Sequence, residues 1–180
     1  MRKQQREAIL ALLEETYKGT ETALHYSTPF ELLVAVIMSA QCTDERVNKI
    51  TARIFPKYNT PEKMGALSQE QLEEEIRDCG LFRSKAKNLL ATCKMLVEVY
   101  GSVIPDTIEE LMKLPGVGKK TANVVASIVY KVPAIAVDTH VFRVSHRLGL
   151  AKGDDPLAVE QELQKAIPKN KWSDAHHWLI

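Results

Sequence analysis

Hydrophobic and polar residues recur along this chain with the period of a helix, and almost no segment alternates with the two-residue period of a strand. Residues 4–17 carry apolar side chains three and four positions apart, as an amphipathic helix does. Residues 30–40 are apolar nearly all round, which predicts a helix buried at the centre of the protein. The pattern contains no repeat period, so it favours an all-α globule over a solenoid.

Capping residues indicate where the helices begin and end. Thr28 with Pro29 starts the central helix, Thr43 starts the next one, and Ser68 with Gln71 forms a capping box. Further helices are expected at residues 61–65, 69–79, 84–100, 108–112, 121–130, 139–148, 156–167 and 173–180. The inner face of the helix at 84–100 is predicted to carry Ala86, Leu89, Leu90, Cys93, Leu96 and Val97.

Length and composition bound the class of protein. A chain of 180 residues with 45% hydrophobic content can bury one good core or two modest lobes. No apolar run approaches the roughly 20 residues that span a bilayer, and no secretory segment is present, so we expect a cytoplasmic protein. The three cysteines show no CxxC spacing, which predicts buried thiols. Two histidines have an acidic residue at helical spacing but no third ligand, so we expect no metal site.

Charge is almost balanced, with 24 basic and 23 acidic residues, so any nucleic-acid face must be local. A basic cluster surrounds one short motif and is either a binding face or solvated surface. Its members are Lys113, Lys119, Lys120, Lys131, Arg143 and Arg147.

That motif is the stretch Leu114 to Asn123, which lies between two expected helices. Gly116 and Gly118 allow a tight bend and a close approach of the backbone, while the second helix directs unpaired N–H groups at whatever binds there. An anion such as phosphate fits this position best. An ordinary helix-turn-helix linker explains the two glycines about equally well.

The sequence Leu114-Pro115-Gly116-Val117-Gly118 followed by lysine, together with Ala136 to Arg143, resembles the signature of endonuclease III, a family of helix-hairpin-helix DNA glycosylases and abasic-site lyases. The stretches Ser39 to Asp44 and His176 to Ile180 extend this resemblance over nearly the whole chain.

The resemblance implies two all-α lobes with a DNA-binding cleft between them. Residues 22–132 would form a six-helix lobe, and residues 1–21 would pack with residues 133–180 in the second. It also implies a [4Fe-4S] cluster held by a loop of four cysteines. Those ligands would lie beyond Ile180, and none of the 180 residues would bind the cluster.

The same resemblance assigns the chemistry. Lys120 would attack the C1′ carbon of a deoxyribose, and Asp138, eighteen residues further on, would stabilise the positive charge that develops on the sugar. Taken without the family, Lys120 is a phosphate-holding surface lysine, as Lys119 is expected to be, and Asp138 is the N-cap of the helix at Thr139.

Further positions are expected to contact DNA. By resemblance, Gln41 and Leu81 would enter the duplex from turns, Asp44 would line the base pocket, and Arg143 would support Asp138 or a phosphate. Taken without the family, Gln41 is a polar helix end and Leu81 a core residue. The hairpin contributes Leu114, Gly116, Gly118 and Lys119 to the DNA-binding set.

The preferred hypothesis is therefore a monomeric bifunctional glycosylase and lyase that repairs oxidised pyrimidines in damaged double-stranded DNA. A monofunctional mismatch glycosylase is disfavoured because such enzymes generally lack the lysine. A non-catalytic helix-hairpin-helix module, the third possibility, needs the glycines but neither Lys120 nor Asp138.

Overall fold

The structure is a computed structural model that describes residues 1–180. It contains helices and no strand, which confirms the all-α fold class. The helices are α1 (Lys3–Tyr17), α2 (Pro29–Met38), α3 (Asp44–Ile54), α4 (Pro61–Gly65), α5 (Gln69–Glu75), α6 (Phe82–Tyr100), α7 (Ile108–Leu111), α8 (Lys119–Tyr130), α9 (Thr139–Arg147), α10 (Pro156–Ala166), the 3-10 helix η1 (Lys169–Lys171) and α11 (Trp172–Trp178).

The helix starts follow from capping side chains. The Thr28 hydroxyl accepts a hydrogen bond from Glu31 N, the Thr43 hydroxyl accepts one from Arg46 N, and Ser68 forms the expected capping box. Several boundaries differ from the prediction by one or two residues, and the largest difference is at the end of α5. Helix α5 ends at Glu75 rather than near residue 79, and α6 begins at Phe82 rather than Ser84.

The chain forms two compact units, which we describe separately. Unit 1 comprises residues 1–22 and 126–180, and unit 2 comprises residues 23–125. The chain passes from unit 2 to unit 1 within α8.

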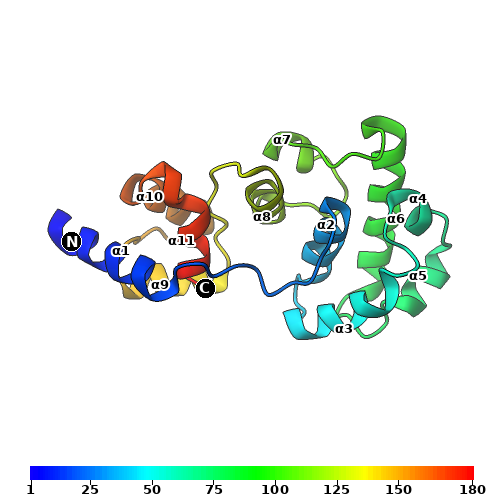
Figure 1. Cartoon of the computed structure of the whole chain (residues 1–180), viewed down its shortest axis with the longest axis horizontal. Helices are drawn as coiled ribbons and strands as arrows, with labels where there is room; N and C mark the ends of the chain where they lie inside the picture. The colour runs from blue at the N-terminus through cyan, green and yellow to red at the C-terminus, as the bar shows by residue number, and fades with distance from the viewer. The chain divides into compact units, whose positions relative to one another are not determined.

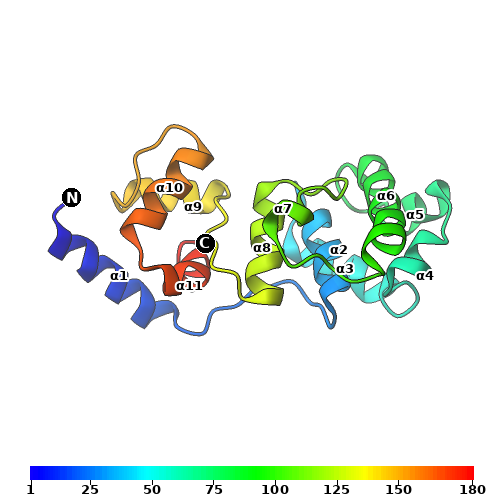
Figure 2. The same ribbon diagram turned by 90° about the horizontal axis from the view of Figure 1, so that it is seen from above.

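Unit 2 is built around α2. All of its residues from Phe30 to Met38 are buried, which confirms the central helix. Helix α2 lies between α8 and α6 (Figures 1 and 2), and α6 also packs against α4 and α5. The buried face of α6 is made of Lys85, Ala86, Leu89, Thr92, Cys93 and Leu96. The prediction that Val97 belongs to this face is wrong, because Val97 lies beyond the edge of the buried stripe and is 42% exposed.

Unit 1 joins the two ends of the chain. Helix α1 packs against α11, and α9 packs against α10 (Figure 1). Its core gathers Ile135, Val141, Leu163 and Trp178, with Ile9 and Leu13 of α1 partly buried against it. The His176 ring nitrogen Nδ1 lies 2.8 Å from the Ala136 carbonyl and so fixes the segment that leads into α9.

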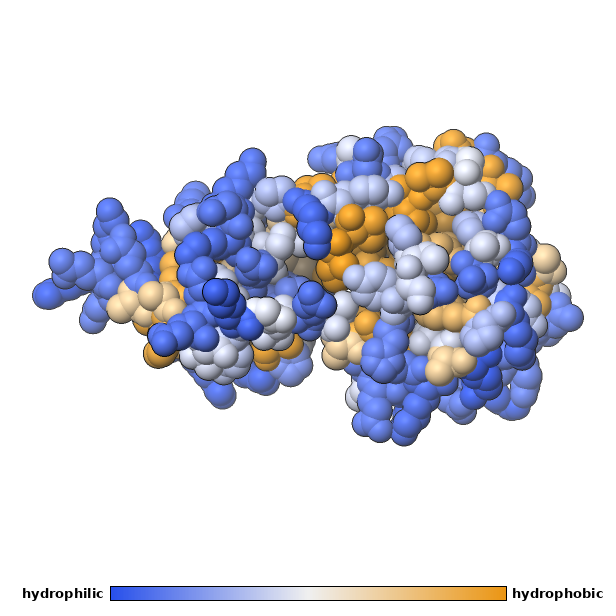
Figure 3. Space-filling model, viewed as in Figure 1, coloured by the Kyte–Doolittle hydropathy of each residue, from blue (hydrophilic) through white to orange (hydrophobic).

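The surface separates by chemistry. Figure 3 shows hydrophilic residues over α3 and hydrophobic residues gathered over α2 and at the C-terminal end of α6. At that end Val99 and Val103 are more than half exposed. None of the helices is long and apolar enough to cross a membrane.

Candidate functional site

The stretch 108–130 folds as the expected helical hairpin in which α7 leads into a turn and α8 leaves it. Thr107 caps α7 by accepting a hydrogen bond from Glu110 N. Within the turn, Val117 N donates to the Leu114 carbonyl at 3.1 Å. The Leu114 side chain is only 2% exposed, so it anchors the turn in the core, and Leu114 can meet a ligand only through its backbone.

The two glycines of the turn have different structural reasons. Gly116 has φ +77°, and a Cβ there would lie 2.9 Å from the Asn88 Cβ of α6. Gly118 has no positive φ, and a Cβ there would meet nothing within 4 Å. Gly116 is therefore required by the fold, whereas the space beside Gly118 is open to a ligand.

Lysines surround this turn. Lys119 and Lys120 occupy the first turn of α8, and both are exposed. The first four N–H groups of a helix have no partner within the helix, so an anion at this end meets both backbone donors and lysine ammonium groups. Lys113 contributes less, because its ammonium lies 2.5 Å from a Glu110 carboxylate oxygen and that ion pair offsets its charge.

Helix α6 holds the hairpin from behind. The Thr92 hydroxyl donates to the Pro115 carbonyl at 2.7 Å, and Asn88 makes the close approach to Gly116. Neither residue was predicted from the sequence. The available signal for Thr92 was its position three residues after Leu89 and four before Leu96, on the predicted inner face, where a hydroxyl needs a hydrogen-bond partner.

Gln41 and Leu81 lie on two turns that meet. Gln41 has φ +53° and Leu81 has φ +58°, a left-handed conformation that non-glycine residues rarely adopt. Both side chains are exposed, Leu81 by 59%. The turns are in backbone contact, because a Cβ at Gly80 would lie 2.9 Å from the Gln41 carbonyl oxygen. The alternative that Leu81 is a core residue is therefore wrong.

Asp44 lies near the first of these turns, as the first residue of α3. Its carboxylate is exposed at a helix N-terminus, where a negative charge is favoured by the helix dipole.

Asp138 and Arg143 belong to α9 in unit 1. Asp138 is half-buried and is the N-cap of α9, because its Oδ1 accepts a hydrogen bond from Val141 N at 2.8 Å. The capping interpretation is thus confirmed, and it uses one of the two carboxylate oxygens. Arg143 is exposed and pairs with the His140 ring nitrogen Nδ1 at 3.1 Å.

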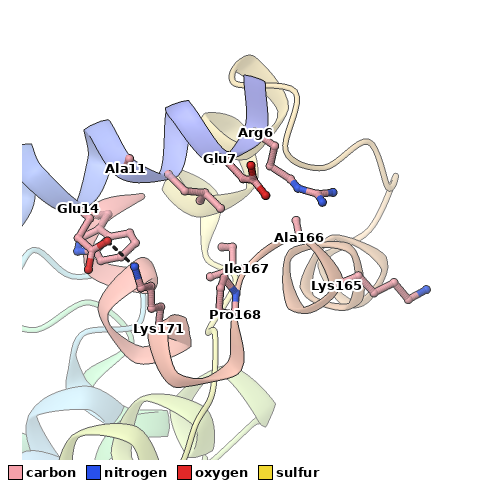
Figure 4. A pocket seen from close by; sticks show the side chains of 11 residues that line it. Arg6, Glu7, Ala11, Glu14, Lys165, Ala166, Ile167, Pro168 and Lys171 are labelled. Carbon is pink, nitrogen blue, oxygen red and sulfur yellow. Dashed lines mark hydrogen bonds and ion pairs between the residues drawn. The ribbon is translucent and has the colours of Figure 1, made fainter. Parts of the chain in front are cut away.

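Unit 1 also contains a pocket of about 390 Å³ between α1 and the segment from α10 to α11 (Figure 4). Arg6 and Glu7 of α1 line one side, and Ala166 lies on the other. An ion pair of 2.5 Å between Lys171 and Glu14 bridges the two walls. None of the site residues predicted from the sequence lines this pocket.

Comparisons with known proteins agree with this hairpin fold. A family model described as the HhH-GPD superfamily of base excision DNA repair proteins matches residues 34–169. Endonuclease III of Bacillus subtilis strain 168 is 50% identical over 97% of this chain and 80% of its own length. Endonuclease III of Escherichia coli K12 is 46% identical over 100% of this chain and 85% of its own length.

Solved structures give the same result. The chain matches an endonuclease III trapped as a covalent intermediate with DNA, with a TM-score of 0.96, 51% identity and coverage of 100% of this chain and 85% of that one. A thermostable thymine-DNA glycosylase matches with a TM-score of 0.83 at 21% identity, which indicates a shared fold. The fold is therefore that of the helix-hairpin-helix DNA repair glycosylases. Within that class, this chain belongs to the endonuclease III family of base-excision DNA glycosylases and abasic-site lyases.

The endonuclease III family is known for a [4Fe-4S] cluster, and such a cluster takes four cysteine thiolates. This chain has three cysteines, all free thiols, of which Cys79 and Cys93 are buried. No group of three or more His, Cys, Asp or Glu side chains is placed to hold a metal ion. The residues described here do not fit the cluster.

Proposed function

We propose that this protein excises oxidised pyrimidines from damaged double-stranded DNA and cleaves the strand at the resulting abasic site, with Lys120 as the nucleophile. The observation that carries this proposal is the position of Lys120. It is exposed in the first turn of α8, two residues after the open space at Gly118.

The proposed reaction begins with loss of a proton from the Lys120 Nζ. Its Nζ lone pair forms a bond to C1′ of the deoxyribose, and the glycosidic bond breaks so that the base leaves with the electron pair and takes up a proton. Asp138 stabilises the positive charge on the sugar during this step. The sugar ring opens to a C1′ Schiff base, loss of a C2′ proton expels the 3′ phosphate, and water then hydrolyses the Schiff base and frees Lys120.

Binding is divided among several groups in this proposal. The backbone of Leu114, Gly116 and Gly118, with the Lys119 ammonium, holds phosphates independently of sequence. Arg143 adds a second cationic contact from α9, and Asp44 lines the pocket for the extruded base. Gln41 and Leu81 enter the duplex and fill the gap that the extruded base leaves, which suits two exposed side chains on adjoining turns. We expect the enzyme to act as a monomer in the cytoplasm, where its DNA substrate lies.

Borohydride trapping tests the nucleophile. The protein is incubated with a duplex that contains one abasic site, and borohydride reduces the Schiff base to a stable adduct that migrates slowly on a denaturing gel. We expect an adduct from the unmutated protein and from Lys119→Ala but none from Lys120→Ala. Lys119→Ala is the matched control, because it removes the neighbouring lysine of the same helix turn.

An adduct that persists in Lys120→Ala would refute the assignment of the nucleophile. Absence of an adduct from the unmutated protein, despite duplex binding, would instead indicate a non-catalytic binding module. Substrate range is tested by comparing base release from duplexes with an oxidised cytosine, an oxidised thymine or an adenine mismatch. Release of adenine alone would contradict the proposed substrate class.

A further inference from the structure

Lys85 is a buried lysine that the proposed chemistry does not use. It lies in the first turn of α6 and is only 5% exposed. Its Nζ donates to the Met38 carbonyl at 2.9 Å, to the Ala40 carbonyl at 2.5 Å and to the Cys79 sulfur at 3.2 Å. The three donors of one ammonium group are thus directed to three acceptors, and none of these acceptors is a carboxylate.

These acceptors connect Lys85 to both left-handed turns. The Ala40 carbonyl belongs to the same peptide plane as the Gln41 N–H, so the Lys85 ammonium fixes the plane that precedes Gln41. The Cys79 sulfur, which accepts from the Lys85 ammonium at 3.2 Å, lies two residues before Leu81. The Lys85 side chain therefore hydrogen-bonds to the chain one residue before Gln41 and two residues before Leu81.

The surroundings suit a cation that acts on backbone geometry. Met38 ends α2, and the final carbonyl groups of a helix lack partners within the helix and favour a positive charge. Burial raises the pKa of the Cys79 thiol, and the hydrogen bond from Lys85 offsets part of this shift. The neutral thiol in turn donates to the Met38 carbonyl at 3.3 Å.

A merely structural explanation does not account for the choice of lysine. A buried charge costs free energy unless it is well paired, and an apolar side chain of similar volume is often at least as stable in such a place. Left-handed backbone also costs about 1–2 kcal/mol per non-glycine residue, so Gln41 and Leu81 are held against a local preference. Residues in such a conformation persist only where the surrounding structure holds them, and they cluster at functional sites.

We propose that Lys85 is a positioning residue for lesion recognition, which holds the Gln41 and Leu81 turns in the geometry that lets both side chains enter the DNA duplex. The proposal rests on the proposed function of Gln41 and Leu81. It assigns Lys85 no contact with DNA.

Discrimination between damaged and undamaged DNA is the quantity to measure. The probes are a duplex with a reduced abasic-site analogue and the same duplex without damage. The discrimination ratio is the dissociation constant for the undamaged duplex divided by that for the damaged one. It is compared among the unmutated protein, Lys85→Met, Gln41→Ala and the double variant. Lys87→Met is the matched control, because Lys87 is an exposed lysine two residues along the same helix. Helical content and thermal unfolding are recorded for every variant.

We expect Lys85→Met and Gln41→Ala each to lower the ratio roughly tenfold. The ratio of the double variant should be no lower than the lower of the two single-variant ratios, because both substitutions disrupt the same interaction. Affinity for undamaged duplex should change less than twofold, and Lys87→Met should leave the ratio unchanged. Lys85→Arg should recover part of the loss, since it restores a cation that donates to carbonyl oxygens.

Two results would overturn the proposal in distinguishable ways. If Gln41→Ala leaves the ratio unchanged, the proposed role of Gln41 fails and the role of Lys85 fails with it. If Gln41→Ala lowers the ratio while Lys85→Met does not, or if the two losses multiply in the double variant, only the positioning role fails.

A second variant covers the case in which Lys85→Met does not fold. Gly80→Ala leaves the Lys85 side chain in place but adds a Cβ 2.9 Å from the Gln41 carbonyl oxygen. We expect it to lower the ratio and to be non-additive with Gln41→Ala. An unchanged ratio in folded Gly80→Ala would refute the dependence on turn geometry.

Discussion

Alanine substitutions at the two hairpin glycines should have different consequences, one for stability and one for DNA binding, although the two positions look alike in the sequence. Gly116→Ala forces an alanine into a left-handed conformation at φ +77°, which costs about 1–2 kcal/mol. The new Cβ also lies 2.9 Å from the Asn88 Cβ, and overpacking of this kind costs about 1–3 kcal/mol. The two costs together destabilise the fold by about 2–5 kcal/mol.

Gly118→Ala should leave stability nearly unchanged. Its Cβ meets no atom within 4 Å, and its backbone needs no left-handed conformation. Replacing glycine lowers the entropy of the unfolded chain and so stabilises by about 0.4–1 kcal/mol. Alanine is a poorer residue than glycine immediately before a helix by a similar amount, roughly 0.5–1 kcal/mol. The same Cβ would, however, occupy the space proposed for a DNA phosphate.

Thermal unfolding and duplex binding measured on both variants separate these effects. For a chain of this size, 1 kcal/mol shifts Tm by about 2–4 °C, so Gly116→Ala should lower Tm by at least roughly 4 °C. Gly118→Ala should hold Tm within about 2 °C. It should weaken duplex binding, measured by fluorescence anisotropy, roughly three- to tenfold, because one phosphate contact is lost.

Equal losses of stability in the two variants would refute the steric distinction between the glycines. Unchanged binding by folded Gly118→Ala would refute the phosphate site beside α8.

Three further predictions concern single side chains. Asp138→Asn should keep the stability of α9, since asparagine caps as well as aspartate, but should abolish adduct formation. Asp138→Ala should abolish the adduct and also lower the free energy of unfolding, measured by chemical denaturation, by about 1 kcal/mol. Full activity of Asp138→Asn would contradict the electrostatic role. Burial raises the pKa of Cys93 to about 12, so at pH 9 the fraction of Cys93 present as thiolate should be roughly 500-fold smaller than that of an ordinary thiol. Iodoacetamide should therefore label the half-buried Cys42 and leave Cys93 unmodified in a peptide map. Burial lowers the pKa of His177, so the folded state disfavours its protonated form and stability should fall as pH drops below about 6.5. The loss of stability between about pH 7.5 and pH 5.5 should be smaller in His177→Gln than in the unmutated protein. An equal loss in both would count against this linkage.

The sequence was most informative where a local rule acts alone. Thr28, Thr43 and Ser68 cap helices as predicted, because capping depends on residues three positions apart. The hairpin was found from its glycines, although only the fold separates Gly116, which abuts α6, from Gly118, which does not.

The positions that were missed depend on tertiary contacts. Periodicity cannot place Lys85 in a buried stripe, because lysine is a polar residue and its two carbonyl acceptors lie more than forty residues earlier in the chain. Helix α6 begins two residues before the predicted start, since the left-handed turn at Leu81 ends the preceding segment without a capping side chain. Val97 was misplaced because periodicity alone does not show where the buried stripe of α6 ends, and the valine lies at its edge with 42% of its surface exposed.

The contacts of α6 also constrain how this protein can change length. Lys85, Asn88 and Thr92 recur at intervals of three and four residues, so they share one side of the helix. Lys85 serves the turns of Gln41 and Leu81, while Thr92 and Asn88 serve the hairpin. Lys85 and Thr92 are seven residues apart, so the helix fixes their separation along its axis at about 10.5 Å. A single inserted or deleted residue between them would rotate one group by about 100° away from its partners. Substitutions on the outer side of this helix can therefore accumulate during evolution, whereas insertions and deletions between residues 85 and 92 should be eliminated.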